Sequence, residues 1–231
     1  MGIDVWEQRQ PVAVSPVEVA MKAPLPTEPV FENPIPVEAT LNQTTDPDWS
    51  GLQTAVQACT RCELHQTRTQ TVFGVGNPSA DLLIIGEAPG ADEDKQGEPF
   101  VGRAGQLLNA MLQAIQLTRG DVYIANILKC RPPNNRDPRP EEAALCSAWL
   151  KRQIELIQPK LILALGRIAG QRLLQVDTPL AKLRGAIHTL PMTQTPLIVT
   201  YHPAYLLRSP GEKRKAWEDL IFVKRTLGGY H

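Results

Sequence analysis

The 231-residue sequence has no long apolar run, no secretory signal and no net charge. A helix that crosses a bilayer needs about 18 or more consecutive apolar residues, and no stretch of the sequence approaches that length. The amino-terminal region has neither the basic nor the apolar segment of a signal peptide. We therefore expect no membrane association and no export, and we expect the protein to lie in the cytoplasm.

The absence of a net charge conceals a difference between two parts of the chain. Residues 1–48 contain eight acidic and two basic side chains, a net charge of −6. Residues 49–231 contain 16 acidic and 22 basic side chains, a net charge of +6. Surplus positive charge is compatible with a domain that binds nucleic acid. The zero total therefore does not argue against a polyanionic partner.

Residues 1–48 also contain eight prolines and have neither a helical nor an alternating apolar pattern. Such a segment buries too little apolar surface to offset the entropy lost on ordering. We therefore predict a disordered, acidic, proline-rich tail over residues 1–48 and one domain over residues 49–231. A solvated leader is the favoured interpretation of the tail, and a docking motif for a protein partner at residues 29–31 or 35–37 is the alternative.

After the tail, apolar runs that favour strands alternate with segments of helical spacing. Strands are predicted at residues 81–85, 122–125, 160–165, 187–190 and 197–200. Helices are predicted at residues 49–58, 104–117, 167–174 and 209–227, and another begins at Pro140. This alternation predicts an α/β fold with a central, mainly parallel sheet. Ligands of such sheets bind beyond the carboxyl ends of the strands, where loops 86–90, 126–136 and 201–208 should converge.

Four cysteines form two pairs, and a shared metal site is the favoured explanation. Two residues separate Cys59 from Cys62, and fifteen separate Cys130 from Cys146. Two disulfides are disfavoured, because nothing indicates export and a bridge across C-x-x-C would be strained. Four unrelated buried thiols are a further alternative. Four thiolates suit either a zinc ion or an iron–sulfur cluster, and the pattern alone slightly favours zinc.

Four motifs occupy the predicted loops and the helix starts beside them. They are residues 86–94 (GEAPGADED), 99–106 (PFVGRAGQ), 126–136 (NILKCRPPNNR) and 202–208 (HPAYLLR). Together with the cysteine spacing, these motifs resemble the family 4 uracil-DNA glycosylases over about residues 52–225.

The resemblance implies a three-layer αβα fold around a four-stranded, mainly parallel sheet. It also implies a [4Fe–4S] cluster on the four cysteines, which moves the choice of cofactor from zinc to iron–sulfur. The implied reaction is hydrolysis of the N-glycosidic bond that joins uracil to DNA, as part of base excision repair. We expect the enzyme to be a monomer that acts on uracil-containing DNA.

A glycosylase must hold an extruded base and stabilise the negative charge with which the base departs. The resemblance assigns stacking on uracil to Phe100. Asn126 ends a predicted strand, where its amide offers a donor and an acceptor to the edge of uracil. His202, at another strand end, could donate to the carbonyl oxygen that gains charge. A core phenylalanine, a turn asparagine and a structural histidine are the respective alternatives.

Glu87 is the candidate for positioning or activating water. In the best-known uracil glycosylases an aspartate occupies the place that Ala88 occupies in this sequence, so the chain departs from that arrangement. Glu93, Asp94 and Asn135 are the alternatives to Glu87, although Glu93 and Asp94 could be only a solvated charge pair. The predicted base-binding set is completed by Gly86, Glu87, Ala88 and Asn135.

The segment after His202 is predicted to contact DNA. Tyr205, Leu206 and Leu207 lie in a predicted loop, where exposed apolar side chains suit a wedge that fills the space left by an extruded nucleotide. Core packing is the alternative for the two leucines. Arg208 supplies positive charge for phosphate contacts. The rival to the enzyme is a non-catalytic iron–sulfur or zinc module that binds DNA or transfers electrons beside a polymerase.

Overall fold

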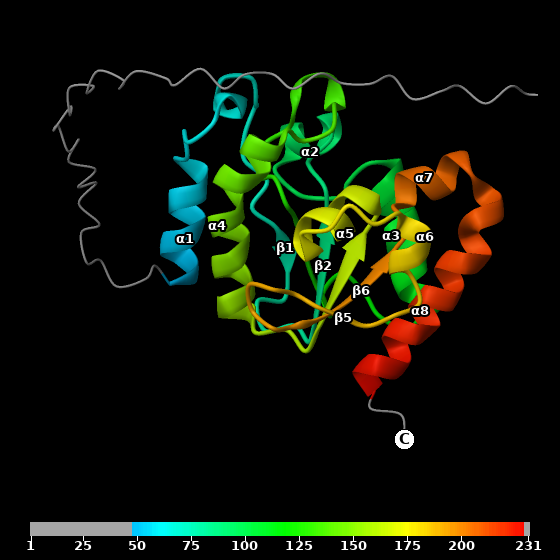
Figure 1. The fold of residues 1–231 in the computed structure, drawn as a ribbon. Coiled ribbons are helices and arrows are strands. Elements are labelled where there is room, and N and C mark those ends of the chain that lie inside the picture. The colour runs from blue at the N-terminus through cyan, green and yellow to red at the C-terminus, as the bar shows by residue number, and fades with distance from the viewer. Residues whose placement is uncertain (1–47, 229–231) are drawn as a thin grey trace, which may run out of the picture. The chain divides into compact units, whose positions relative to one another are not determined.

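The computed structural model of the protein describes residues 48–228 (Figure 1). The predicted tail lies outside the described residues, apart from Asp48, and its disorder and its docking motif stay predictions. Asp48 caps the first helix, since its Oδ1 accepts a hydrogen bond of 2.8 Å from the backbone N–H of Gly51. In the described part of the chain, no helix is both long enough and apolar enough to cross a membrane.

Helices and short strands alternate along the described residues (Figure 1). The helices are α1 (Trp49–Gln57), α2 (Ala91–Gln96), α3 (Arg103–Ala114), α4 (Pro140–Ile157), α5 (Arg167–Leu174), α6 (Leu180–Leu183), α7 (Pro203–Arg208) and α8 (Lys213–Gly228). The strands are β1 (Val75–Gly76), β2 (Leu82–Gly86), β3 (Tyr123–Asn126), β4 (Leu161–Leu165), β5 (His188–Thr189) and β6 (Pro196–Thr200). The 3-10 helices η1 (Glu63–Gln66), η2 (Pro133–Asn135) and η3 (Pro210–Glu212) lie in the connections.

The strands form one sheet in the order β1-β3-β2-β4-β6-β5. The four central strands are parallel, as predicted, and the short strands β1 and β5 extend the sheet at its two edges by antiparallel pairing. From β2 the chain passes to β3 on one side, and from β3 it returns past β2 to β4. The strand order therefore reverses at β2, and a ligand site is expected beyond the carboxyl ends at this point.

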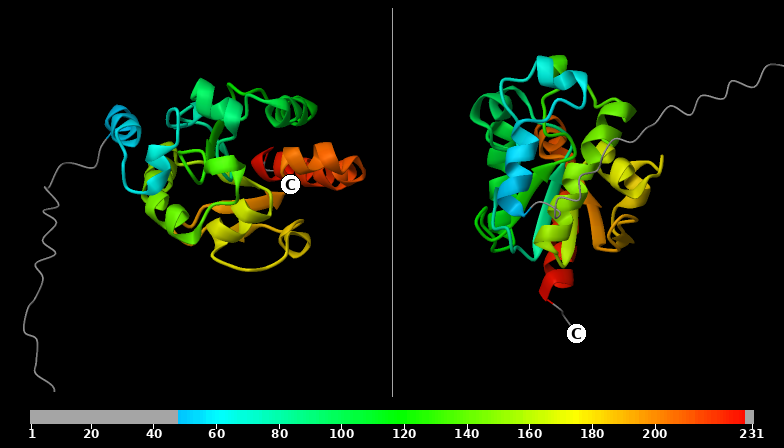
Figure 2. Two further views of the ribbon diagram at one scale, coloured as in Figure 1. Left: turned by 90° about the horizontal axis from the view of Figure 1, so that it is seen from above. Right: turned by 90° about the vertical axis from the view of Figure 1, so that its left-hand side faces the viewer.

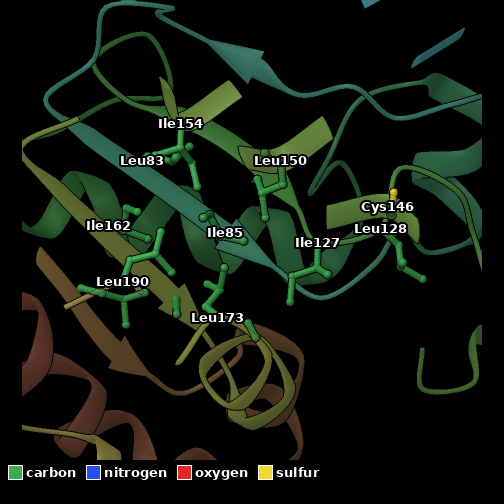
Figure 3. Close-up of a cluster of buried hydrophobic side chains, with 14 of the residues drawn as sticks. Leu83, Ile85, Ile127, Leu128, Cys146, Leu150, Ile154, Ile162, Leu173 and Leu190 are labelled. Atoms are coloured by element: carbon green, nitrogen blue, oxygen red, sulfur yellow. The ribbon is translucent and has the colours of Figure 1, made fainter. Parts of the chain in front are cut away.

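Helices cover both faces of the sheet, which gives the predicted three layers (Figure 2). Alternate strand residues point to opposite faces. Leu83 and Ile85 of β2 therefore join the apolar cluster against α4, α5 and α6, whereas Leu82 and Ile84 join the cluster against α3, α7 and α8. Figure 3 shows the first cluster, in which Leu83 and Ile85 lie near Leu150 of α4. Burial on both faces explains why the central strands are continuous apolar runs.

Helix α4 begins at Pro140, as predicted from the sequence. Proline suits the first helical turn because its fixed φ matches the helix and its missing N–H would be unpaired there. The carboxylates of Glu141 and Glu142 follow directly and complement the positive end of the helix. The sequence therefore indicates this boundary locally.

Several short elements were not predicted. Segments 91–96, 180–183 and 203–208, expected as loops or left unassigned, are the helices α2, α6 and α7, and residues 75–76 form β1. One or two turns contain too few residues to show a helical apolar period in the sequence. The helix predicted from residue 209 begins later, at Lys213, because η3 precedes it.

Candidate functional site

A pocket of about 450 Å³ lies at the carboxyl ends of β2, β3 and β6. The three loops that were predicted to converge form its walls, together with residues that lead into α3. The predicted site residues that line it are Glu87, Ala88, Phe100, Asn126, Asn135, His202, Tyr205 and Arg208. The fold thus brings these side chains to one place, and the volume is typical of sites for small organic groups.

Asn126 presents an amide oxygen without a partner at this pocket. The residue ends β3 and is 2% exposed, and its Oδ1 is buried with no hydrogen bond to any described residue. Gly86 ends the neighbouring strand β2, where a Cβ would collide with Asn126 Oδ1 and would lie 2.7 Å from the Phe100 ring. Leaving a buried acceptor unpaired costs roughly 1–3 kcal/mol. The site therefore favours a ligand that donates a hydrogen bond at this point.

Phe100 has a left-handed backbone conformation, with a φ of 56°, that few residues other than glycine adopt. Arg119 holds it there, because its guanidinium donates to the carbonyl oxygens of Phe100 at 3.2 Å and Pro99 at 2.8 Å. Gly105 leaves space for the Phe100 carbonyl, with which any side chain would collide. The Phe100 ring centroid lies 5.6 Å from that of His202. An aromatic ring is thus fixed against one wall of the pocket.

His202 is the N-cap of α7, and this role determines which ring nitrogen carries hydrogen. Its Nδ1 accepts a hydrogen bond of 3.1 Å from the backbone N–H of Ala204, so the neutral ring has its hydrogen on Nε2. Burial, with a smaller effect of the Arg208 charge, lowers the pKa of His202 to about 4. At neutral pH the pocket therefore contains an uncharged imidazole with an Nε2–H donor.

Glu87 follows β2 and is half-buried in the pocket wall. Burial, together with the negative charge of Asp137, raises the pKa of Glu87 to about 7, although the positive charge of Arg167 opposes the shift. Asp137 lines the same pocket. Near neutral pH, the Glu87 carboxyl group is therefore divided between its protonated and charged forms, as suits a group that accepts a proton.

Glu93 and Asp94 are not a solvated charge pair, and that interpretation is wrong. The Glu93 carboxylate accepts hydrogen bonds of 3.1 Å from the backbone N–H groups of Gly90 and Val101, and so joins two loops of the pocket. Asp94 is 3% exposed, and both of its carboxylate oxygens lie 3.0 Å from the N–H of Thr69. Glu93 therefore stabilises the loops of the pocket, whose wall it joins, and Asp94 stabilises the chain at Thr69.

Tyr205, Asn135 and Arg208 are exposed residues at the rim of the pocket. Tyr205 is 38% exposed and stacks on Tyr201, with ring centroids 5.4 Å apart. Asn135 accepts a hydrogen bond of 2.7 Å from Nε of Arg131. Aromatic and basic side chains at a pocket mouth suit a polymer that extends beyond the group inside.

The prediction that Leu206 is an exposed wedge is wrong. Residues 203–208 form helix α7 rather than a loop. The helix turns Leu206 inward, where it is 1% exposed and belongs to the apolar cluster between the sheet and α8. Leu207 is 36% exposed. Tyr205 and Leu207 are therefore the apolar side chains that this helix presents to solvent.

The segment that leads to His202 is braced by α8. Asp219, which is 2% exposed, accepts hydrogen bonds from Nε of Arg184 at 2.7 Å and from the Thr200 hydroxyl at 2.6 Å. The Arg184 guanidinium also lies 4.6 Å from the centroid of the Tyr201 ring. Because Thr200 and Tyr201 directly precede His202, this network fixes the backbone that presents the imidazole.

The four cysteines line a second pocket together with side chains of η1 and α4. All four are free thiols; Cys130 and Cys146 are buried and the other two are half-buried. Arg68 donates to Sγ of Cys130 at 2.9 Å, and the backbone N–H of Lys129 donates to Sγ of Cys146 at 3.3 Å. Among residues 48–228, no three Cys, His, Asp or Glu side chains are grouped as ligands of a single metal ion. Four sulfur atoms around one pocket, two of them facing N–H donors, are a donor set of the kind that holds thiolate-bound metal groups.

Sequence reasoning missed Asp137, Arg119 and Lys129. Lys129 is 1% exposed and donates from Nζ to the backbone carbonyl oxygen of Asn126 at 2.9 Å. Burial lowers the pKa of Lys129 to about 8, although the neighbouring cysteines favour its charged form. Lys129 follows two apolar residues directly after the buried end of β3. A single charged residue in such an apolar segment is a sequence signal that could have marked Lys129 as a functional candidate. Arg119 lies between the motifs at residues 99–106 and 126–136 but belongs to neither, and no local signal indicates its role.

Comparison with known proteins places most of the domain among relatives. The family model of the uracil DNA glycosylase superfamily matches residues 73–221. A type-4 uracil-DNA glycosylase of Archaeoglobus fulgidus is 47% identical over 179 residues, which cover 75% of this chain and 90% of that protein. One of Thermotoga maritima is 47% identical over 176 residues (74% and 91%), and one of Sulfurisphaera tokodaii is 42% identical over 176 residues (73% and 80%). The segment matched by the family model contains every residue described above as lining the strand-end pocket.

Proposed function

The chain belongs to the uracil-DNA glycosylase superfamily, and we propose that its strand-end pocket binds a uracil extruded from DNA. Its activity is that of a uracil-DNA glycosylase, a DNA-repair hydrolase that breaks the N-glycosidic bond and leaves an abasic site. One observation carries the assignment of this activity to the pocket. The buried, unpartnered amide oxygen of Asn126 lies in the wall that also contains Phe100 and His202.

Asn126 is proposed to recognise the edge of uracil, with Phe100 stacked on its face. Uracil presents an N–H donor beside a carbonyl acceptor, which match the amide oxygen and the amide NH₂ of Asn126. Cytosine presents a bare nitrogen and an amino group at the same edge. The same amide orientation would then leave two mismatched buried groups, at roughly 1–3 kcal/mol each. This difference supports selection of uracil over cytosine.

His202 is proposed to stabilise the departing base. When the bond between the sugar carbon C1′ and the uracil nitrogen N1 breaks, the electron pair stays on uracil and charge develops on its carbonyl oxygens. The neutral ring of His202 offers Nε2–H to such an oxygen, and its pKa of about 4 keeps it neutral across the physiological range. A preorganised donor of this kind contributes about 10²- to 10³-fold in rate.

Glu87 is proposed to position the water that attacks C1′ and to accept a proton from it. A bond forms between the water oxygen and C1′ as uracil leaves with the electron pair, and the released proton passes to the carboxylate. The raised pKa of Glu87, about 7, supports proton acceptance near neutral pH. The carboxylate also favours the positive charge that develops on the sugar.

DNA on either side of the uracil is proposed to contact the rim of the pocket. Tyr205, Arg208 and Asn135 are exposed and line that rim. The net charge of +6 on residues 49–231 supports binding to the phosphates. The monomeric state, the cytoplasmic location and a protein partner for residues 1–48 stay predictions.

The cysteines are proposed to hold a [4Fe–4S] cluster through Cys59, Cys62, Cys130 and Cys146. The support is the all-sulfur donor set around one pocket and the N–H donors that face two of the sulfurs. Such a cluster, when bound, supplies a covalent crosslink between the segment after α1 and the loop after β3. The chain's own residues perform each step of the reaction.

Anaerobic purification tests the cofactor directly. The protein should be brown, with broad sulfur-to-iron charge-transfer absorbance and about four iron atoms and four acid-labile sulfides per chain. Colourless protein with one zinc ion per chain would contradict the iron–sulfur assignment.

Excision of uracil from a single-stranded oligonucleotide tests the function of the pocket. After incubation with the purified protein, alkali should cleave the strand at the former uracil, and the Asn126→Ala variant should yield far less cleavage while it melts near the wild-type temperature. If folded, iron-loaded wild-type protein left the oligonucleotide intact, the non-catalytic DNA-binding module would be the better description.

A further inference from the structure

Lys129 is a charged residue in the protein interior that the proposed reaction does not use. It is 1% exposed, although burial of an ammonium group is unfavourable unless partners compensate it. Its Nζ donates to the backbone carbonyl oxygen of Asn126 at 2.9 Å, and its side chain lines the cysteine pocket. One buried cation therefore contacts the residue proposed to select the base and also faces the proposed cluster site.

Residues 126–130 are tied along one side to the end of strand β2. The backbone N–H of Ile127 donates to the carbonyl oxygen of Gly86 at 3.0 Å, and that of Leu128 donates to the carbonyl oxygen of Glu87 at 3.1 Å. Gly86 and Glu87 belong to the wall of the strand-end pocket or directly adjoin it. A displacement of this segment therefore moves the pocket wall.

The same segment is tied at its other end to the cysteine site. The backbone N–H of Lys129 donates to Sγ of Cys146 at 3.3 Å, and its carbonyl accepts a hydrogen bond of 2.8 Å from the N–H of Val72. Cys130, a proposed ligand, is the next residue along the chain. The two sites are therefore joined by five consecutive residues, of which residues 126–129 have backbone groups bonded to neighbouring parts of the structure.

Arg68 offers a natural comparison with Lys129. Its guanidinium donates to Sγ of Cys130 at 2.9 Å and to the carbonyl oxygen of Gln57 at 3.1 Å. Both cations can offset the negative charge of thiolates in a medium of low dielectric constant. Of Arg68 and Lys129, only Lys129 also contacts Asn126.

We propose that Lys129 is a positioning residue for base recognition. Its ammonium group fixes the peptide that follows Asn126 and offsets the charge of the cysteine thiolates, so that the order of the base pocket depends on the occupancy of the cysteine site. This inference rests on the proposed roles of Asn126 and of the four cysteines. It extends them by assigning the connection between the two sites to one side chain.

Three variants separate the two contacts of Lys129. Lys129→Met keeps the length of the side chain and removes both the charge and the donor. Lys129→Gln removes the charge and keeps an N–H donor. Arg68→Gln is the matched control, because it removes a cation from the cysteine site and leaves the contact with Asn126 intact. Each variant is measured for iron per chain, melting temperature, inhibition by free uracil, and kcat and KM on a single-stranded uracil oligonucleotide.

Inhibition by free uracil, normalised to the iron-loaded fraction, is the deciding measurement. We expect Lys129→Met to weaken it by about tenfold or more, which is the loss of one charge-assisted hydrogen bond. Lys129→Gln should recover most of that affinity, and KM should change more than kcat in Lys129→Met. Arg68→Gln should lower the iron content while its loaded fraction binds uracil as the wild type does.

Two outcomes would overturn the inference. One is Lys129→Met protein whose loaded fraction binds uracil with wild-type affinity, and the other is an equal loss of affinity in Arg68→Gln. If Lys129→Met does not fold, Lys129→Gln is the deciding variant. If Lys129→Gln then binds free uracil no better than an Asn126→Ala variant does, the inference is also contradicted. Wild-type protein that neither excises nor binds uracil would instead refute the proposed function, so the two failures are distinguishable.

Discussion

The strand-end pocket and the cysteine pocket differ in how far their polar groups are already satisfied. In the strand-end pocket, Asn126 Oδ1 has no partner, and His202 uses one ring nitrogen to cap α7 and has the other for a ligand. In the cysteine pocket, Sγ of Cys130 and Sγ of Cys146 each accept a hydrogen bond from a neighbouring donor. The first arrangement suits a molecule that enters and leaves, and the second suits a group that stays with the fold.

This difference indicates which property each site controls. Apart from changes at His202, which also caps α7, variants in the strand-end pocket should lower the rate of excision and leave the melting temperature nearly unchanged, because the groups that they remove contribute little to the folded state without ligand. Variants at the cysteine pocket should lower stability first, because they release a loop held from several sides. The predictions below test this separation in order of decreasing effect on excision.

The largest effect is expected for Glu87→Gln. Loss of a group that accepts a proton typically costs 10²- to 10⁴-fold in rate. Since the pKa of Glu87 is raised to about 7, the charged form becomes more abundant as pH rises through 7, and wild-type kcat/KM should increase by about tenfold per pH unit below that value. The Glu87→Gln profile should be flat over the same range.

Asp137→Asn is the control for this pH profile. Asp137 raises the pKa of Glu87 through its negative charge, so its removal should shift the rise in kcat/KM to lower pH while the maximum rate stays high. A Glu87→Gln variant that kept the wild-type pH profile would assign water activation to another group.

His202→Ala should lower kcat by about 10²- to 10³-fold, the usual effect of removing one donor to a developing oxyanion. This variant also removes the N-cap of α7, so His202→Ser serves as the control, because serine is a good N-cap residue. The serine variant should recover the melting temperature but not kcat. Recovery of kcat in the serine variant would mean that His202 contributes only as the N-cap of α7 and not as a donor to uracil.

Asn126→Asp should lower uracil excision by about 10- to 100-fold, because it replaces the amide donor with a carboxylate. The variant should gain trace activity on cytosine, whose amino group a carboxylate accepts. Asn134→Asp, an exposed change in the same loop, should leave both activities unchanged. Wild-type excision by Asn126→Asp would require the base to bind elsewhere.

Tyr205→Ala should weaken excision from paired duplexes by about tenfold and from single strands by less, because only a duplex needs a side chain to replace the extruded base.

Leu206→Ala tests whether Leu206 packs in the core, as the structure shows, or acts as a wedge in DNA. Because Leu206 is buried, its truncation should cost about 2–5 kcal/mol of stability and reduce excision equally on both substrates. A duplex-specific loss in Leu206→Ala would restore the wedge assignment.

Cys130→Ser should have the smallest effect on excision per iron-loaded molecule and a clear effect on stability. The variant should contain less iron, and each kcal/mol of lost stability should lower Tm by about 2–4 °C. Thermal melting and iron analysis of the same preparation measure this. Full loss of excision by the iron-loaded fraction at an unchanged Tm would contradict the separation between the two sites.

Much of the site could be predicted from local sequence. Gly86, Asn126 and Thr200 each end an apolar run, so the convergence of the loops that follow them was evident from the rule for parallel sheets. Leu206 could not be placed in the same way. A six-residue helix gives no visible period, and its inward face depends on how α7 packs against the sheet and α8.

The sequence by itself determined the α/β architecture, the apolar runs of the central strands and most of the polar residues of the pocket, because apolar runs, strand-end polar residues and motif spacing are local properties. Only the tertiary structure decided the chemical state of those residues. The pKa of Glu87 near 7, the Nε2 hydrogen of His202 and the burial of Lys129 against Asn126 each depend on groups distant in sequence or on exclusion from water. Burial and directed hydrogen bonds are set by packing, which no single segment contains.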